Sequence, residues 1–518
     1  MKKIILMSFL STLIFSPLLS AQKSIICGTT EMKAISERLI ANKKAFSLNP
    51  ITERSITYVP VKFHIIANDA GSGGVKETAV LDMLCGMNEF YASFGIQYYI
   101  KNGFDYMSSS SAAIDPQSSG GELQIKSKKV KQMVNIFLCQ SFSSMVPGLL
   151  GYYTEGFPGY QNDFLVIKKS EVTKSSYTAE HEMGHFFSLL HPFNGWDENP
   201  YNPKIHGNPV NILFSPDNPQ LPIEFADESN CQIAGDFLCD TPASYNFAND
   251  YWMFKGCSPM DTFVHDYHNQ IVDPDEKNVM DYFADCTDYH FSTSQQNLII
   301  TDLTNRKATL GNNKINSTTT PNLNIITTNV LNPNIDSGKI LSNYGDIKLA
   351  WKDIPGATTY IVEVDIASNF ASPSFKSAIV NSSEWTVPGL IKNKKYYWRV
   401  YPFNEYSTCA GFSKTFVFTT GQWLVSTTEI KELNSWKIDP NPVSKNSTVS
   451  LELNSINAFN SDVIITDISG KIISNIKNIR IQEGAQSIEI STANLTIGMY
   501  IVQLRTGTGI STQKLLIQ

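Results

Sequence analysis

Residues 177–191 read YTAEHEMGHFFSLLH, and this stretch determines what the first half of the chain can be. On a helix, His181 and His185 are four residues apart, so they share one face within reach of a single ion. His191 follows six residues later, after the chain has left the helix and turned back. Three neutral imidazoles bind zinc and leave a fourth coordination position for water. The spacing therefore predicts a zinc centre on these three histidines.

Glu182 stands next to the first histidine, where its carboxylate would lie beside the metal-bound water. A carboxylate in that place can take a proton from the water and pass it to the leaving amine of a cleaved peptide bond. We therefore predict Glu182 as the general base of a hydrolase. The competing interpretation is a helix with ordinary buried or surface histidines, although three of the eight histidines fall within this short stretch.

Ser188 departs from the pattern HExxHxxGxxH, which is typical of metzincin proteases. The pattern has glycine at this position, because glycine tolerates the positive φ of the turn. A non-glycine residue in the left-handed region costs about 1 kcal/mol, which a folded domain can absorb. The departure bears more on the geometry of the turn than on metal binding.

Strand-like and helical segments alternate around the histidine motif. A β-branched run from Ser55, SITYVPVKFHII, is typical of a first strand, and apolar residues have helical spacing from Glu77 to Phe94. Further strands are predicted at 96–100, 134–138 and 163–168, a helix at 178–188 and a last helix near 294–304. Residues 192–280 are irregular, which inside a compact domain is typical of a functional loop region. We predict an α/β (α+β) domain over residues 55–314.

Two later motifs extend the pattern: residues 231–242 read CQIAGDFLCDTP and residues 278–282 read NVMDY. Together with the histidine motif they resemble the pappalysin family of metzincin zinc proteases, particularly its bacterial, ulilysin-like members. The resemblance implies a metzincin-like catalytic domain in which Met280 forms the Met-turn, an apolar floor under the zinc histidines. It also implies that the phenol of Tyr282 lies near the metal and stabilises the oxyanion. For Met280 alone, ordinary packing is the alternative.

Four of the eight cysteines cluster in the segment that follows the histidine motif: Cys231, Cys239, Cys257 and Cys286. An exported chain meets an oxidising compartment, so two disulfides are expected here, with three possible connectivities. The resemblance implies the pairs Cys231–Cys257 and Cys239–Cys286. It also implies that Asp285 lines the substrate pocket, where a carboxylate favours Arg or Lys by charge pairing. A solvated loop carboxylate is the alternative for Asp285.

The same loop region is a candidate for calcium binding. Asp236 and Asp240 offer carboxylates on irregular backbone, which suit that ion, and some members of the resembled family bind it. The sequence alone does not decide between calcium sites and solvated acids.

The N-terminus has the order of a secretory signal peptide over residues 1–21. Two lysines precede an apolar run that ends at Leu19, and Ser20 and Ala21 follow as small residues before the expected cleavage point. An N-terminal anchor helix is the alternative. Since no later apolar stretch is long enough to span a bilayer, the mature chain is predicted to be exported without a membrane span.

Residues 22–54 are predicted as a pro-segment that a cut near Arg54 removes. Cys27 and Gly28 lie close to its start. In the resembled family, such a Cys-Gly pair can place its thiolate on the open position of the zinc, so the resemblance implies a cysteine switch at Cys27. The alternative is a disulfide between Cys27 and either Cys85 or Cys139.

The rest of the chain is predicted to form two all-β sandwich modules. Residues 322–420 resemble a fibronectin type III domain, with Trp351 in the core and Tyr396, six residues after Leu390, as the tyrosine corner. Residues 434–518 contain DPNP, VIITDISGK and IGMYIV in that order and resemble the C-terminal sorting domain of the type IX secretion system. An ordinary terminal sandwich is the alternative.

Composition limits the function of the whole chain. A chain of 518 residues is too long for a single hydrophobic core, so several domains are expected. The net charge of -7, without a basic patch, does not favour nucleic acid as a partner. The leading prediction is a zinc metalloendopeptidase made as a zymogen, exported through periplasm and outer membrane to act on proteins or peptides outside the cell or at its surface. The alternatives are a surface adhesin with a degenerate protease domain and a different zinc hydrolase.

Overall fold

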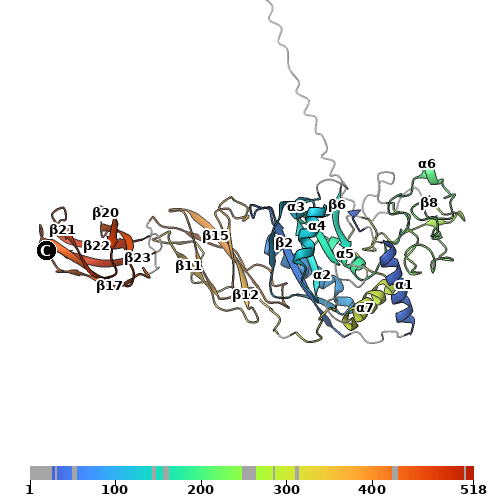
Figure 1. Cartoon of the computed structure of the whole chain (residues 1–518), viewed down its shortest axis with the longest axis horizontal. Coiled ribbons are helices and arrows are strands. Elements are labelled where there is room, and N and C mark those ends of the chain that lie inside the picture. Colours follow the sequence, from blue (N-terminus) through green and yellow to red (C-terminus); the bar gives the residue numbers. More distant parts are fainter. Residues whose placement is uncertain are drawn as a thin grey trace, which may run out of the picture. The chain divides into compact units, whose positions relative to one another are not determined.

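The computed structural model describes residues 26–29, 32–48, 55–142, 148–155, 163–247, 264–283, 286–309, 314–321, 323–335, 337–422, 430–506 and 509–518. The chain divides into two compact units, Met1–Asn322 and Leu323–Gln518 (Figure 1). The predicted signal peptide and the predicted pocket residue Asp285 lie outside the described residues. Within the described ranges, no helix has the length and apolar character needed to cross a membrane.

A mixed seven-stranded sheet forms the centre of the first unit, in the order β1-β6-β7-β5-β2-β3, with β4 also paired to β2. Strands β7, β5, β2, β3 and β4 run parallel, whereas β6 is antiparallel to β7 and β1 is parallel to β6. The strands are β1 (Ile26–Cys27), β2 (Thr57–Ala67), β3 (Ile96–Ile100), β4 (Asp105–Ser108), β5 (Val134–Cys139), β6 (Leu149–Thr154) and β7 (Phe164–Lys168).

Helices cover both faces of this sheet, which explains why β5 is buried along its whole length (Figure 1). Residues of α3 and α4 pack with Phe137 and Tyr152 on one face, while α5 lies against β6 and β7. Helix α1 packs against α7. The helices are α1 (Met32–Leu48), α2 (Glu77–Tyr91), α3 (Ser110–Ile114), α4 (Ser119–Lys128), α5 (Thr178–Phe186) and α7 (Thr293–Ala308).

Between α5 and α7 the described chain has only short elements: α6 (Pro203–His206), β8 (Val264–His265) and β9 (Ile271–Val272). A disulfide joins Cys231 to Cys239, whose Cα atoms are 5.1 Å apart. The predicted pairs Cys231–Cys257 and Cys239–Cys286 are therefore wrong. A tight turn through Gly235, with φ at +57°, brings the two cysteines that are close in sequence together. Cys286 is also disulfide-bonded, and Cys257 lies outside the described residues.

The second unit begins with a β-rich module. A five-stranded sheet has the order β10-β16-β15-β12-β13, and β11 pairs with β14. Trp351 is buried and its ring packs edge-on against Tyr360, while the hydroxyl of Tyr396 accepts the backbone N–H of Ile391 at 2.9 Å. The strands are β10 (Lys339–Ile340), β11 (Ile347–Ala350), β12 (Thr359–Asp365), β13 (Lys376–Val380), β14 (Glu384–Val387), β15 (Lys395–Phe403) and β16 (Phe416–Thr419).

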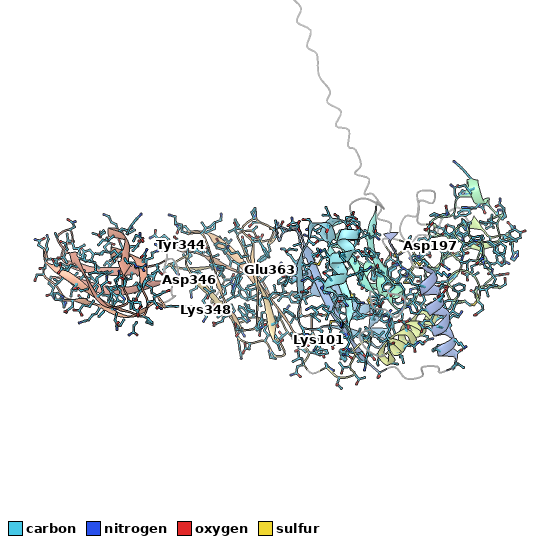
Figure 2. All side chains as sticks on the ribbon, viewed as in Figure 1. Lys101, Asp197, Tyr344, Asp346, Lys348 and Glu363 are labelled. Atoms are coloured by element: carbon cyan, nitrogen blue, oxygen red, sulfur yellow. A yellow bond between two sulfur atoms is a disulfide. The ribbon has the colours of Figure 1, made fainter. Side chains whose placement is uncertain are left out.

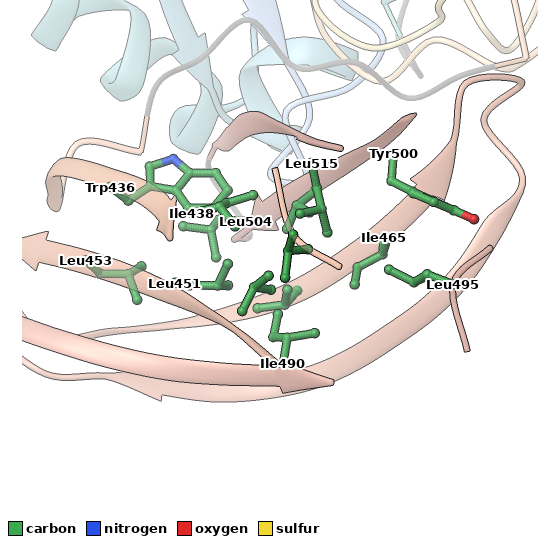
Figure 3. Close-up of a cluster of buried hydrophobic side chains, with 14 of the residues drawn as sticks. Trp436, Ile438, Leu451, Leu453, Ile465, Ile490, Leu495, Tyr500, Leu504 and Leu515 are labelled. Carbon is green, nitrogen blue, oxygen red and sulfur yellow. The ribbon is translucent and has the colours of Figure 1, made fainter. Parts of the chain in front are cut away.

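The last module packs a three-stranded sheet, β17-β18-β21, and a four-stranded sheet, β20-β19-β22-β23, around a core of its own (Figure 3). Alternate residues of β18 and β22, such as Leu451 and Val502, are buried in this core. The strands are β17 (Leu433–Asp439), β18 (Thr448–Ser455), β19 (Phe459–Asp467), β20 (Ile472–Ile481), β21 (Gly484–Ser491), β22 (Gly498–Arg505) and β23 (Ile510–Ile517).

Candidate metal centre

Helix α5 carries His181, Glu182 and His185, and all nine of its residues are buried. Gly184 lies on the side of the helix that faces Met280, where an added Cβ would come within 2.2 Å of the Met280 sulfur. Met280 is itself completely buried. The side chain of Met280 therefore packs directly on the turn of helix between the two histidines, and glycine at position 184 permits that approach.

The chain leaves α5 through a left-handed turn at Ser188, where φ is +72°. The N–H of Ser188 donates to the carbonyl of His185, and its hydroxyl accepts from the side chain of Asn42 at 2.9 Å. The turn that the sequence pattern requires thus forms with serine in place of glycine. It brings His191 back to the helix.

The three histidine rings converge through their Nε2 atoms. The Nε2 atom of His191 lies 3.2 Å from that of His181 and 3.0 Å from that of His185. Each Nδ1 faces an oxygen that can only accept, so Nδ1 carries the proton and each Nε2 presents a lone pair; these acceptors are the Val279 carbonyl, the Leu189 carbonyl and the Asp197 carboxylate. Nitrogens bound to one tetrahedral zinc lie roughly 3.3 Å apart. The residues therefore fit a zinc ion.

The carboxylate of Glu182 faces the same space. Its Oε2 accepts from the hydroxyl of Thr29 at 3.2 Å and from the thiol of Cys27 at 3.4 Å, while Oε1 has no hydrogen-bond partner among the described residues. Burial raises the pKa of Glu182 to about 8. A cation held by the three converging lone pairs would favour the ionised form of Glu182, and that form can accept a proton from water.

Strand β1 brings Cys27 into the centre, although Cys27 lies 155 residues before Glu182 in the chain. The Cys27 sulfur and the three histidine nitrogens all lie within 4.8 Å of one another. The hydroxyl of Tyr282 lies beside the Cys27 backbone, 3.2 Å from its nitrogen and 3.4 Å from its oxygen. Cys27 and Cys139 both carry free thiols, so the alternative disulfide between Cys27 and Cys85 or Cys139 does not form.

The sequence argument missed the contribution of α1. The Arg38 guanidinium is buried and donates to the carbonyls of Phe186 at 2.7 Å and His185 at 3.0 Å, at the C-terminal end of α5. It also pairs with Glu155 and Asp302. No local sequence motif indicates this role, because the partners of Arg38 lie more than 100 residues away in the chain. The arginine thus adds a donor to carbonyls at the helix end, where Ser188 also donates to His185 and Arg306 also donates to Phe186.

A second buried polar group lies in the loop that follows. Glu224 is 3% exposed, and neither oxygen of its carboxylate has a hydrogen-bond partner among the described residues. An added Cβ at Gly235 would come within 2.0 Å of Glu224 Oε2, so this carboxylate points at the Gly235 turn. Asp236 is fully buried next to it and accepts from Thr241 at 2.8 Å. Burial and the neighbouring Asp236 raise the pKa of Glu224.

Comparison with known protein families identifies the last module of the chain. Residues 437–518 match a family model described as a secretion system C-terminal sorting domain, which confirms the predicted sorting domain. The chain is accordingly secreted or held at the cell surface.

Two curated relatives match about half of the chain. An extracellular metalloprotease of Sordaria macrospora is 24% identical over 277 residues, which cover 50% of this chain and 79% of the relative. An extracellular metalloprotease of Colletotrichum graminicola is 27% identical over 304 residues, which cover 53% of this chain and 88% of the relative.

Two solved structures also match. The FN1–FN3 domains of chicken CNTN1 match with 13% identity and a TM-score of 0.14, over 36% of this chain and 64% of that chain. The fn3 domain of the human collagen alpha-1(XX) chain matches with 17% identity and a TM-score of 0.15, over 20% of this chain and 95% of that chain.

Proposed function

We propose that this chain is a secreted zinc metalloendopeptidase of the metzincin type, with pappalysin-like features, that is made as a zymogen. The observation that carries the proposal is the convergence of three Nε2 lone pairs at 3.0–3.2 Å beside the Glu182 carboxylate. Three lone pairs so close repel one another unless a cation lies between them. The two fungal relatives named extracellular metalloproteases support the same activity.

Each residue of the centre has its own role in the proposed hydrolysis. Zinc held by His181, His185 and His191 would supply a Lewis acid and lower the pKa of a bound water. Glu182 accepts the proton of the attacking water and returns it to the leaving amine. The Tyr282 hydroxyl, now beside the Cys27 backbone, donates to the oxyanion once that backbone has left. Met280 supports the histidines from below.

The edge of the central sheet suggests which substrates fit. Strand β6 lies next to α5, and β1 adds to its outer edge by pairing Ile26 and Cys27 with Leu149 and Gly151. An extended peptide binds such an edge through its main chain, with little dependence on sequence. We infer that substrates are polypeptides in extended conformation that take the place of β1. Asp285 remains the residue proposed to favour Arg or Lys after the cleaved bond.

The position of Cys27 supports latency. Burial and the charge of Glu182 raise the pKa of the Cys27 thiol, so its thiolate requires a cation beside it. With zinc on the three histidines, the sulfur would take the position that the attacking water needs. Pairing of β1 with β6 at the same time blocks the edge where the peptide would bind.

Full-length chain and its Cys27→Ser variant test both parts of the proposal. We expect the variant to cleave a denatured protein roughly tenfold faster or more, because a hydroxyl is a much weaker zinc ligand than a thiolate; tenfold corresponds to about 1.4 kcal/mol. A zinc chelator should abolish this activity. Cys139→Ser, which alters a free cysteine in β5, is the control and should stay latent. Bound zinc without any cleavage would favour a binding protein instead.

We propose the two buried carboxylates of Glu224 and Asp236 as a calcium site. Calcium takes carboxylate and hydroxyl oxygens, and Glu224, Asp236 and Thr241 offer both in one buried place. A cation there would offset the repulsion between the two buried carboxylates. Asp240, the other predicted ligand, instead accepts from Ser292 and from the Ser294 N–H at the start of α7.

Calcium is therefore expected to raise the thermal unfolding midpoint of the first unit. Binding at a hundred times the dissociation constant stabilises a folded state by about 2.7 kcal/mol. In Glu224→Gln this gain should disappear, since the amide replaces a charged ligand. Exposed Glu228 lies four residues on, and Glu228→Gln should keep the full response. An equal response to calcium in both variants would place the ion elsewhere.

A further inference from the structure

The three histidines of the metal centre differ in what holds their Nδ1 atoms. His181 and His185, which are fixed by α5, donate to backbone carbonyls. His191, which lies outside the helix, donates to the carboxylate of Asp197 at 2.6 Å. Asp197 belongs to the irregular segment after α5 and is labelled in Figure 2. His191, which lies outside the helix, is thus the only one of the three histidines whose Nδ1 atom has a carboxylate partner.

Asp197 is itself held in one orientation. Its second oxygen accepts the N–H of Gly195 at 2.9 Å, and Gly195 has a φ of +96°. The hydroxyl of Ser215 donates to the carbonyl of Gly195 at 2.5 Å, and an added Cβ on Gly195 would lie 2.6 Å from that hydroxyl oxygen. The carboxylate is therefore held by hydrogen bonds on both of its oxygens.

Aromatic contacts alone do not orient His191 for a metal. Its ring stacks on Phe193, with centroids 4.6 Å apart, and meets Tyr282 edge-on at 4.9 Å. These contacts restrict the plane of the ring but are indifferent to which nitrogen carries the proton. The Asp197 carboxylate can only accept, so it selects the tautomer with Nδ1 protonated and Nε2 free.

We propose that Asp197 is a positioning residue of the metal centre: it holds His191 in the ligating tautomer and makes its Nε2 a stronger zinc ligand. A carboxylate behind a histidine ligand draws the Nδ1 proton toward itself and leaves more electron density on Nε2. This inference rests on the proposed function and assigns a residue of the loop to the same centre.

Zinc affinity of the full-length chain tests the proposal. Competition with a chromogenic chelator should show that Asp197→Asn binds zinc 10–100-fold more weakly, the range found when such partners are removed. Asp197→Glu keeps the charge and should recover part of the loss. Asp217→Asn is the matched control, because Asp217 accepts the N–H groups of Glu198 and Asn199 in the same loop without touching His191. Its zinc affinity should equal that of the unaltered chain.

A second readout separates positioning from simple loop damage. Cobalt in place of zinc should give absorption bands that shift in Asp197→Asn and stay unchanged in Asp217→Asn, since only the first change alters the hydrogen-bond partner of a ligand, His191. Equal zinc affinity and equal cobalt spectra in all variants would overturn the role of Asp197. Absence of tight zinc binding by the unaltered chain would instead overturn the proposed function.

Discussion

Replacing Glu182 with glutamine is expected to abolish peptide cleavage while the protein keeps its zinc. The amide has nearly the same shape, so the three histidines and their partners stay in place. It cannot accept a proton from water, and general base catalysis contributes about 10²–10⁴-fold to rate. The change should be made in the Cys27→Ser background, because the Cys27 thiol contacts Glu182. Turnover and zinc content are measured on the same sample.

Glu180→Gln provides a matched control on the same helix. Glu180 is also buried, but among the described residues its carboxyl makes no hydrogen bond to Cys27, Thr29 or the three histidines, in contrast to Glu182. We expect this variant to keep most of its activity. Turnover near the unaltered rate in Glu182→Gln, with zinc still bound, would exclude Glu182 as the base.

Replacing Arg38 with methionine is expected to destabilise the first unit by about 3–5 kcal/mol, the usual cost of breaking a buried ion pair from one side. Methionine fills much of the volume but removes the ion pair of Glu155 with Arg38 and one of the two donors to the carbonyl of Phe186. Tyr153 still donates to Glu155, and Arg306 still donates to Phe186. Asp302 keeps its partner Arg306, which limits the loss. The network therefore makes α1, although predicted as pro-segment, an integral support of the end of α5.

Hydrogen exchange of α5 amides in increasing urea measures this effect within one unit of the chain. The control is Lys44→Met, an exposed position on the same helix, which should leave the exchange unchanged. Equal exchange in both variants would contradict a structural role of Arg38. If the role holds, a chain cut near Arg54 keeps α1 bound through these contacts, and a chain expressed without residues 1–54 folds less stably.

Much of the central sheet follows from sequence patterns. The strand predicted at 96–100 coincides with β3, those at 134–138 and 163–168 differ from β5 and β7 by one residue, and the last helix is longer than predicted by five. These segments have the apolar periodicity that burial requires. Strand β6 was not predicted, because Gly151 and the tyrosines around it form a short run without clear alternation. The place of β6 in the sheet is set by its pairing with β7, which the sequence of β6 alone does not reveal.

The candidate site likewise has residues that the sequence pattern predicts and residues that it does not. The histidines and Glu182 could be recognised because a helix and one turn bring residues 181–191 together, so spacing alone carries the geometry. The disulfide pairing could not be derived, since it depends on the path of the loop through Gly235. Asp197 stands six residues from His191, yet nothing in that spacing distinguishes it from other acids of the loop.

The sequence by itself determined the local chemistry of this protein: two histidines and a carboxylate on one helical turn, a third histidine after a turn, and the sorting motifs at the C-terminus. Such features arise within a few residues of backbone, where periodicity fixes geometry. The tertiary structure alone decided that Cys27 contacts Glu182 and that Arg38 donates to the end of α5. It also buries the Glu224 carboxylate where no described residue is its hydrogen-bond partner. Those contacts join residues far apart in the chain, and only the packing of the whole domain brings them within hydrogen-bond distance.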